Sequence, residues 1–212
     1  PVIPAPMAAA QGYDAALLLF YALHQAQSSE PAKIKTALEN LNRQVAGVIT
    51  TYDHPFSKTD HDALTGIPNR RSFDIASERE WEIALREQRA LSLLLLDVDY
   101  FKLYNDRYGH QAGDDTLRLI AVTLKSALRR PADLVARYGG EEFACILPDT
   151  SFEDAMFLAR DLEHKVRDCA IVHENSTVAP VVTVSIGVAT RDGNTDGDAT
   201  GLIRLADHQL YQ

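Results

Sequence analysis

The chain has few cysteines, no excess of positive charge and no long apolar run. Its two cysteines, Cys145 and Cys169, form no CxxC pair, so the sequence predicts neither a zinc site nor a disulfide framework. The net charge of -9 leaves no broad basic surface for a nucleic acid. The longest apolar run, residues 15–23, is far shorter than the ~20 residues of a membrane span. These absences predict a soluble protein of a reducing compartment that binds no nucleic acid.

The composition is that of a globular protein with two unequal parts. Of its 212 residues, 46% are hydrophobic and 24% are charged, which suits one packed domain plus an appendage. We predict a boundary between residues 1–61 and residues 62–212. The first part is expected to hold helices over 13–26 and 31–41 and a strand over 45–52. It is too small for an independent core, so we expect a partial sensor-like or accessory segment, a small helical appendage.

The second part alternates helix and strand signals. Asn69 is placed to cap a helix that runs to about Gln88, and Ser151 opens another that reaches about Cys169. A helical stretch after residue 99 breaks around 109–113 and resumes to about 129. Strands are expected over 91–96, 134–138, 143–147 and 181–190, with a last helix over 202–210. This order predicts an α+β domain around a mixed central sheet that contains one β-hairpin.

The buried strand ends in an Asp-x-Asp pattern. Side chains two apart on an extended chain point the same way, so Asp97 and Asp99 can face one site. Carboxylates are the ligands that Mg²⁺ prefers, together with substrate phosphates. The pattern is short, however, and acidic residues also end strands in solvent. On its own it leaves both a metal site and a solvated strand end open.

The hairpin carries two glycines followed by two glutamates. Gly139 and Gly140 permit positive backbone angles and leave room for a close ligand. Neighbouring residues on a strand point to opposite faces, so only one glutamate can share a metal with Asp97. We choose Glu141, which lies beside the turn, over Glu142. The alternative is an ordinary surface hairpin.

The stretch from Asn105 to Asp114 combines an amide, an imidazole and a carboxylate with two glycines. An amide both donates and accepts hydrogen bonds, and a carboxylate accepts two parallel N–H bonds. These groups complement the edges of guanine. A polar break between two helices explains the same residues equally well.

These patterns follow one another in a fixed order. The chain contains Asp62-Ala63-Leu64-Thr65, then Asp97 to Lys102, Asn105 to Asp114, Arg137-Tyr138-Gly139-Gly140-Glu141-Glu142-Phe143, Val184 to Ala189, and Ala206-Asp207 with Leu210-Tyr211. In this order they resemble the GGDEF family of diguanylate cyclases over residues 62–212, in its GGEEF form. The resemblance implies a central mixed five-stranded sheet flanked by helices, similar to nucleotidyl cyclases and polymerase palms. It also implies that two GTP molecules are condensed into cyclic di-GMP, with release of two pyrophosphates.

The resemblance assigns roles to residues of this chain. Asp97, the backbone carbonyl of Val98 and Glu141 are expected to hold Mg²⁺ or Mn²⁺ ions. Glu141 is also expected to help deprotonate the ribose 3′-hydroxyl, with Lys102 steadying phosphate charge. Asn105 and Asp114 are expected to read guanine, with His110 close to the nucleotide and Glu142 supporting the metal site. A homodimer is expected, because each domain holds one GTP and two must face each other.

A second site is expected at Arg130-Pro131-Ala132-Asp133, five residues before the glycine pair. This RxxD pattern resembles the site at which product-inhibited family members bind cyclic di-GMP, and it predicts an allosteric site at Arg130 and Asp133. The alternative reading is a helix end followed by a proline. An inactive domain that only binds cyclic di-GMP is the alternative function. Family members also carry a Lys and an Arg beyond the last helix, and this sequence stops at Tyr211-Gln212 before them.

Residues 7–64 show a partial resemblance of another kind. Ala10 to Ala15 and Gly47 to Lys58 are similar to the C-terminal part of periplasmic binding proteins for branched-chain amino acids. Most of both lobes of such a protein is absent, so amino-acid binding is not expected. The cyclase domain is expected in the cytoplasm, and the sequence leaves open whether the natural full-length protein is attached to a membrane.

Overall fold

The computed structural model describes residues 60–192 and 197–211, together with residues 19, 33, 45–46 and 51–52. The chain divides into two units, Pro1–Thr59 and Asp60–Gln212, and each is described by itself. In the first unit, strands β1 (Val45–Ala46) and β2 (Thr51–Tyr52) pair antiparallel. The prediction of a single strand over 45–52 is therefore wrong, because this pairing requires the chain to reverse in between. Leu19 and Lys33 are helical, and the rest of the two predicted helices lies outside the described residues.

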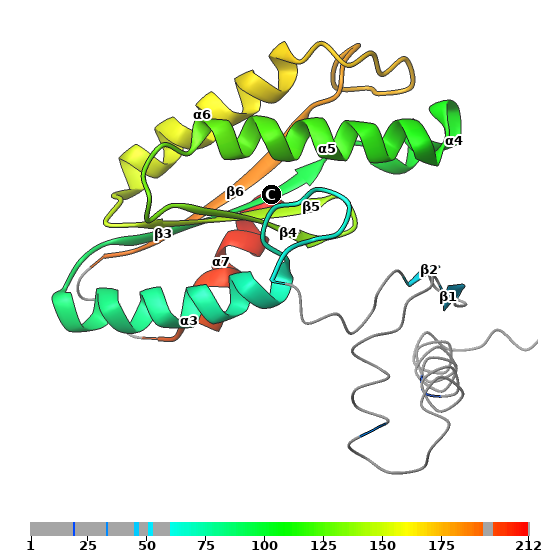
Figure 1. Cartoon of the computed structure of the whole chain (residues 1–212). Helices are drawn as coiled ribbons and strands as arrows, with labels where there is room; N and C mark the ends of the chain where they lie inside the picture. Colours follow the sequence, from blue (N-terminus) through cyan, green and yellow to red (C-terminus); the bar gives the residue numbers. More distant parts are fainter. Residues whose placement is uncertain are drawn as a thin grey trace, which may run out of the picture. The chain divides into compact units, whose positions relative to one another are not determined.

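The second unit alternates helices and strands as the sequence predicts (Figure 1). Asn69 accepts a hydrogen bond from the backbone N–H of Ser72 at 3.1 Å, and Ser151 accepts one from Asp154, so both predicted helix caps are confirmed. Boundaries move by a few residues, the most at the last strand and last helix. The elements are α3 (Arg70–Glu87), β3 (Leu91–Val98), α4 (Phe101–Tyr108), α5 (His110–Ala127), β4 (Leu134–Gly139), β5 (Glu142–Pro148), α6 (Phe152–Asp168), β6 (Val184–Arg191) and α7 (Ala199–Leu210).

The sheet has the order β4-β5-β3-β6, and every neighbouring pair is antiparallel. Within the described part of this unit there are four strands, so the expected mixed five-stranded sheet is wrong in count and in direction. The reason is that two βαβ units interleave. Strands β3 and β4 run parallel but have β5 between them, and β5 and β6 run parallel with β3 between them. The overall α+β class is as expected.

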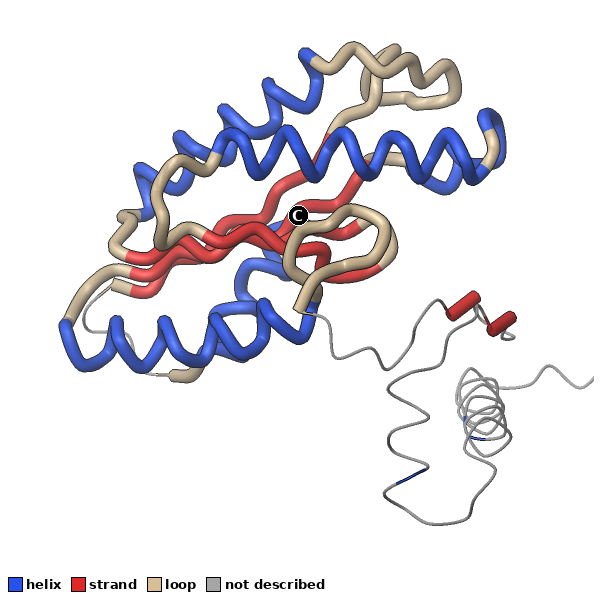
Figure 2. The backbone as a smooth tube through the Cα atoms, viewed as in Figure 1, coloured by secondary structure: helices blue, strands red, loops and turns tan. Residues whose placement is uncertain are grey.

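The core forms two layers because β3 is apolar on both faces. Leu94, Leu96 and Val98 pack toward α5 and α6, whereas Leu93 and Leu95 pack toward α3 and α7. Figure 2 shows these two helix pairs on opposite sides of the sheet. The near-continuous leucine run of β3 is what a strand covered on both faces requires. It holds the end of β3, and therefore Asp97, at a fixed place.

Helix α7 lies directly on β6. A Cβ atom at Gly187 would stand 2.1 Å from the Ala206 carbonyl oxygen and 2.6 Å from the Leu210 nitrogen, so only glycine permits this approach. Leu95 pairs with Gly187, two positions before Asp97. The close packing therefore brings the end of α7 toward the end of β3. No helix in the described segments has the length and apolarity needed to cross a lipid bilayer.

Candidate functional site

Three carboxylates gather at the end of β3. Asp97 is the direct cross-strand partner of Glu142, the first residue of β5, so both side chains lie on the α3 and α7 face. Glu141 precedes it in the turn between β4 and β5, not on the strand. The prediction that both glutamates lie on one strand is therefore wrong. Both approach Asp97, and neither makes an ion pair within the described residues.

The charges of these groups act on one another. Partial burial, followed by the charges of Glu141, Glu142 and Asp99, raises the pKa of Asp97 from 3.8 to about 6. The pKa of Tyr211, at the end of α7, is raised by partial desolvation and then by the charge of Asp97. The site is therefore strongly negative, and a cation would be stabilised in it.

Asp99 makes hydrogen bonds to residues outside the acidic cluster. Its two carboxylate oxygens accept hydrogen bonds from the hydroxyls of Thr183 (2.5 Å) and Ser185 (2.6 Å), and its N–H donates to the Thr183 carbonyl. Next to it, the buried His173 ring lies 3.3 Å from the Tyr100 carbonyl oxygen. These bonds fix the chain where β3 passes into α4. Asp99 therefore anchors the loop, and its charge still reaches Asp97.

The polar stretch predicted to read guanine forms the junction of α4 and α5. The Oδ1 atom of Asn105 is buried and has no hydrogen-bond partner in the described part of the chain. It lies against Gly113, where a Cβ atom would stand 1.9 Å away. Asp114 is half-buried beside it, whereas Lys102 and His110 are exposed on the first turns of α4 and α5. An unpaired buried acceptor next to a carboxylate is suited to binding a polar ligand.

The acidic residues fit a metal that is completed by its substrate. No group of three His, Cys, Asp or Glu side chains in the described segments converges into a ready-made metal centre. Mg²⁺, however, is commonly held by one or two carboxylates plus phosphate oxygens and water. Partial burial is the largest cause of the raised pKa of Asp97, and the charges of Glu141 and Glu142 add to it, so these carboxylates lie close enough to repel each other. Asp97 and Glu141, with the Val98 carbonyl at the end of β3, therefore fit such an ion.

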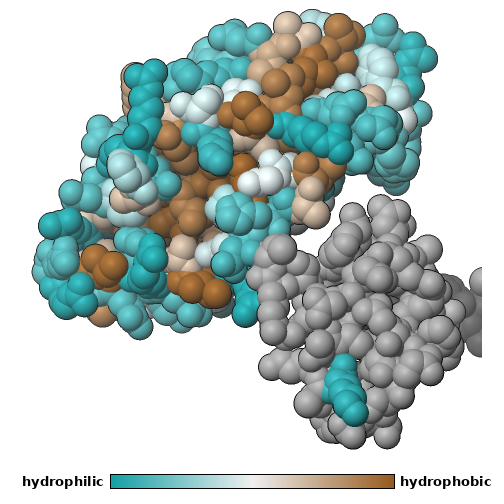
Figure 3. Space-filling model, in the orientation of Figure 1, coloured by the Kyte–Doolittle hydropathy of each residue, from teal (hydrophilic) through white to brown (hydrophobic). Residues whose placement is uncertain are grey.

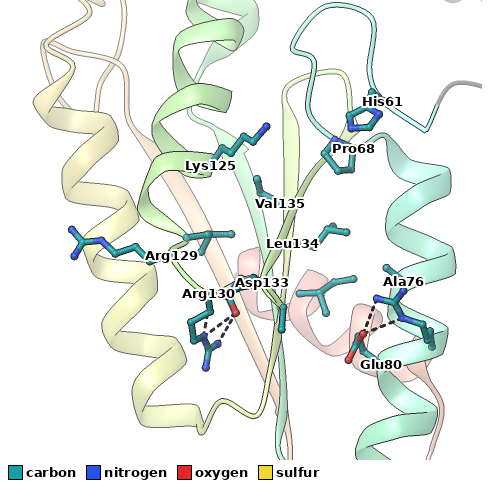
Figure 4. Close-up of a pocket in the computed structure, with 15 residues that line it drawn as sticks. His61, Pro68, Ala76, Glu80, Lys125, Arg129, Arg130, Asp133, Leu134 and Val135 are labelled. Atoms are coloured by element: carbon teal, nitrogen blue, oxygen red, sulfur yellow. Dashed lines mark hydrogen bonds and ion pairs between the residues drawn. The ribbon is translucent and has the colours of Figure 1, made fainter.

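The predicted second site lies at the start of β4. Arg130 donates to Asp133 with a shortest distance of 2.7 Å and to the Thr150 hydroxyl at 2.6 Å. The Asp133 side chain is only 4% exposed. Both residues line a cavity of about 510 Å³ between α3 and the end of α5, together with Lys125 and Arg129 (Figure 4). In Figure 3, apolar surface shows between the two helix layers and is bordered by hydrophilic side chains.

The structure thus brings the sequence-predicted residues into two places. Asp97, Val98 and Glu141 meet at one end of the sheet, with Lys102, Asn105, His110 and Asp114 on the adjoining helices. Arg130 and Asp133 lie at the other end of β4. Sequence reasoning missed Thr183 and His173, and it gave no site role to Ser185 and Tyr211, although both belong to the ordered motif series. Thr183 and His173 carry no local sequence signal, because only the folded chain brings them next to Asp99 and Tyr100.

Comparison with protein families gives one match over most of the chain. Residues 59–212 match the model of the diguanylate cyclase GGDEF domain. Diguanylate cyclase DgcM of Escherichia coli is 42% identical over 152 residues, which cover 72% of this chain and 35% of that protein. Response regulator PleD of Caulobacter vibrioides is 35% identical over 181 residues, covering 85% of this chain and 39% of that protein. The chain thus spans about a third of the length of these curated relatives.

Solved structures show the same fold. The GGDEF domain of DgcB from Caulobacter crescentus, solved in complex with c-di-GMP, superposes with a TM-score of 0.65 at 31% identity. The match covers 73% of this chain and 89% of that one. Diguanylate cyclase SiaD of Pseudomonas aeruginosa, solved with its activator SiaC, has a TM-score of 0.63 at 38% identity, covering 72% and 57% of the two chains.

Proposed function

Since the chain belongs to the family of diguanylate cyclase GGDEF domains, we propose that it joins two GTP molecules into cyclic di-GMP and releases two pyrophosphates. We place the cyclase domain at about residues 62–212. GTP is an intracellular nucleotide, so the domain would work in the cytoplasm.

The observation that carries this proposal is the uncompensated acidic cluster at the end of β3. Asp97, Glu141 and Glu142 lie together without a cationic partner in the described residues, and the pKa of Asp97 is raised to about 6. Leaving charges unpaired costs stability, so such a cluster is expected where a ligand supplies the opposite charge. A metal–nucleotide complex does so.

Asp97, Glu141 and the Val98 carbonyl would hold the metal, which we propose to be Mg²⁺ or Mn²⁺. When bound, divalent ions would neutralise the triphosphate and make the ribose 3′-hydroxyl easier to deprotonate. Glu141 would accept the proton of that hydroxyl. Glu142, on the same face as Asp97, would keep the site negative and so favour the ion.

The junction of α4 and α5 would select the base. The unpaired Oδ1 of Asn105 would accept an N–H of guanine, and the Asp114 carboxylate would accept others. Lys102, which makes no ion pair within the described residues, would neutralise phosphate charge, and His110 would lie near the nucleotide. Buried polar groups that remain unpaired with the wrong base give strong discrimination.

A cyclic product with two equivalent linkages requires two nucleotides in antiparallel orientation. One copy of the site, as proposed, has residues for one guanine and one triphosphate. We therefore propose that turnover needs two copies of the domain that face each other, each supplying one GTP. A single copy would bind GTP and release no cyclic product.

Product inhibition is proposed at the second cluster. Arg130 and Asp133 line the cavity beside β4, and Lys125 and Arg129 add positive charge there. A guanidinium and a carboxylate together can hold the phosphate and the base of cyclic di-GMP. Since Arg130 and Asp133 are bonded to each other, the ligand would share or replace that ion pair.

The activity is tested by incubating the purified protein with GTP and Mg²⁺, and separately with Mn²⁺. Cyclic di-GMP and pyrophosphate are then measured by liquid chromatography and a coupled assay. We expect both products in a ratio of two pyrophosphates to one cyclic di-GMP, and no cyclic product from ATP. The Asp97→Asn variant is the negative control.

Two results would contradict the cyclase proposal. One is a folded wild-type protein, dimeric at the assay concentration, that makes no cyclic di-GMP with either metal. Binding of cyclic di-GMP by such a protein would favour the inactive receptor. The other is product formation that persists in Asp97→Asn, which would place the chemistry elsewhere.

A further inference from the structure

The side chain of Arg137 joins the glycine turn to a loop at the start of the unit. Its Nε and Nη2 atoms donate to the Gly140 carbonyl oxygen at 3.0 and 2.8 Å. Its Nη1 atom donates to both carboxylate oxygens of Asp62, at 3.1 and 3.2 Å. The two side chains are only 18% and 21% exposed, so this contact is largely shielded from water. One guanidinium therefore binds the turn and the loop at the same time.

Asp62 is held firmly as the acceptor. It accepts hydrogen bonds from the backbone N–H of Thr65 (2.8 Å) and from its hydroxyl (2.6 Å). Partial burial acts to raise the pKa of Asp62, but the Thr65 hydrogen bonds and the Arg137 charge outweigh it and lower the pKa. The Arg137 N–H also donates to the Pro68 carbonyl oxygen at 2.9 Å. The loop that ends at Pro68 thus fixes both the backbone and the side chain of Arg137.

The glycine turn joins β4 to β5, whose pairing ends at Gly139 and Glu142. A Cβ atom placed on Gly140 would meet no neighbour within 4 Å, so this residue faces open space on its side-chain side. Glycine also has the least restricted backbone of any residue. Together with the hairpin pairing, the two hydrogen bonds from Arg137 set the direction of the Gly140 carbonyl. In a planar trans peptide the next N–H points the opposite way, so they also orient the Glu141 N–H and the start of its side chain.

We propose that Arg137 is a positioning residue that holds Glu141 toward Asp97, and that Asp62 acts on the metal site through it. The proposal rests on the proposed function in so far as Glu141 is a metal ligand. The loop of Asp62 to Pro68 then belongs to the catalytic machinery, although none of its residues reaches the metal. Partners of this kind, one step removed from the ligands, commonly change metal affinity by about 10–100-fold.

The test measures Mn²⁺ binding by electron paramagnetic resonance, together with kcat and KM for GTP, in the 212-residue chain. In Arg137→Lys and Arg137→Gln the forked contact is lost, so we expect about tenfold weaker Mn²⁺ binding and a lower kcat. The KM for GTP at saturating metal should change less, because Asn105 and Asp114 are untouched. The control Arg167→Gln removes an exposed pair with Glu163 on α6 and should leave all values unchanged.

A double-mutant cycle tests the role of Asp62. Asp62→Asn should weaken Mn²⁺ binding by less than the Arg137 variants, because Arg137 keeps its bonds to Gly140. In the Arg137→Gln background, the same substitution should have no further effect. Additive effects of the two substitutions on Mn²⁺ affinity would overturn the proposed path from Asp62 to Glu141. The cycle uses Arg137→Gln, so it remains valid even if Arg137→Lys is poorly folded.

Two outcomes separate this proposal from the cyclase proposal. Mn²⁺ affinity and kcat within twofold of wild type in folded Arg137 variants would overturn the positioning role, whatever happens to the melting temperature. A wild-type chain that binds Mn²⁺, loses it in the Arg137 variants and makes no cyclic di-GMP would sink the cyclase proposal and support the positioning role.

Discussion

The two ends of strand β4 carry charged clusters that differ in whether a cationic side chain neutralises the carboxylates. At the end near Gly139, the carboxylates of Asp97, Glu141 and Glu142 repel one another and no described cation neutralises them. At the start of the strand, Arg130 already neutralises Asp133. Five residue steps of ~3.4 Å, about 17 Å, separate the two. The first cluster is not neutralised without a cation, whereas the second is already neutralised, and a ligand proposed there would share or replace its bonds.

This difference indicates where ligand binding would stabilise the fold and where the ligand would compete with bonds that the folded protein already makes. A cation at the acidic cluster relieves a repulsion that the folded chain would otherwise retain, so binding and stability increase together. A ligand at Arg130 would share or replace the bonds to Asp133 and Thr150 that the protein already makes. We therefore expect loss of charge to have opposite effects on stability at the two ends of β4.

The largest expected effect is the loss of turnover at the acidic end. Asp97→Asn removes the charge of the proposed metal ligand while keeping the shape of the side chain. We expect product formation to fall by at least about 10²–10³-fold, the scale for losing one preorganised electrostatic group. Initial rates of cyclic di-GMP formation give the measurement. Asp74→Asn, an exposed carboxyl on α3, is the control, and a loss of less than tenfold in Asp97→Asn would contradict the assignment.

The neutralised end should respond in stability and in inhibition. Arg130→Ala leaves the Asp133 carboxylate buried without its partner, which should lower the free energy of unfolding by about 1–3 kcal/mol. Basal turnover should remain, and inhibition by cyclic di-GMP should be lost. Urea unfolding and inhibition curves measure the two effects.

A matched pair on α5 serves as the control for Arg130. Arg118 and Asp115 have the same spacing along the chain, but both are exposed. Arg118→Ala should therefore change the unfolding free energy by less than about 1 kcal/mol. Equal effects in the two variants would show that burial of Asp133 does not matter.

Nucleotide affinity should depend on one glycine beside the acidic end. A Cβ atom at Gly113 would stand 1.9 Å from Oδ1 of Asn105 and 3.2 Å from the Phe101 ring, so Gly113→Ala must displace the Asn105 amide. We expect about tenfold weaker GTP binding, the worth of roughly one hydrogen bond. Isothermal titration with a non-hydrolysable GTP analogue measures it. Gln111→Ala, at an exposed position two residues earlier, should bind as wild type. Unchanged binding in Gly113→Ala would remove Asn105 from the base site.

The smallest expected effect is a gain in stability at the acidic end. The pKa of Asp97 is about 6 in the folded chain and 3.8 without its surroundings. Above pH 6 the carboxyl is ionised in both states and the repulsion is fully present. Between pH 6 and 3.8 the folded state takes up a proton, so wild-type stability rises as the pH falls. Asp97→Asn should therefore be more stable than wild type at pH 7.5, and this advantage should shrink through that range.

The expected gain is on the order of 1 kcal/mol after allowance for solvent screening at this half-exposed group. Urea unfolding in EDTA at pH 7.5 and pH 4.5 measures it. A variant that is less stable than wild type at pH 7.5 would show that Asp97 is neutralised in the free protein. The comparison between the two ends of β4 would then fail.

Local signals in the sequence predicted the elements of the second unit well. Asn69 and Ser151 cap the helices that they were expected to cap, and the leucine run of β3 is buried on both faces as predicted. The direction and number of strands could not be derived in this way. They depend on β5 and β6 entering on either side of β3, and no local pattern specifies that choice.

For the candidate site, too, local sequence patterns predicted some features, whereas others depend on how the strands are arranged. The motif spacing predicted which residues belong to the two ends of β4, and the residue roles remain predictions to be tested. The placement of Glu141 in the turn, with Glu142 opposite Asp97, depends on a register that bulges between Arg137 and Gly139. The bond between Arg137 and Asp62 joins residues far apart in sequence. Contacts of this kind become visible only once the chain is folded.

The central place of β3 in the sheet has a consequence for the synthesis of the protein. β3 is flanked by β5 and β6, and β6 is the last of these sheet strands to leave the ribosome. Until then, one edge of a leucine-rich strand stays open, and such edges pair readily with other chains. A nascent chain that stalls before Val184 should therefore aggregate or be held by chaperones, and the domain should fold only after β6 has been translated.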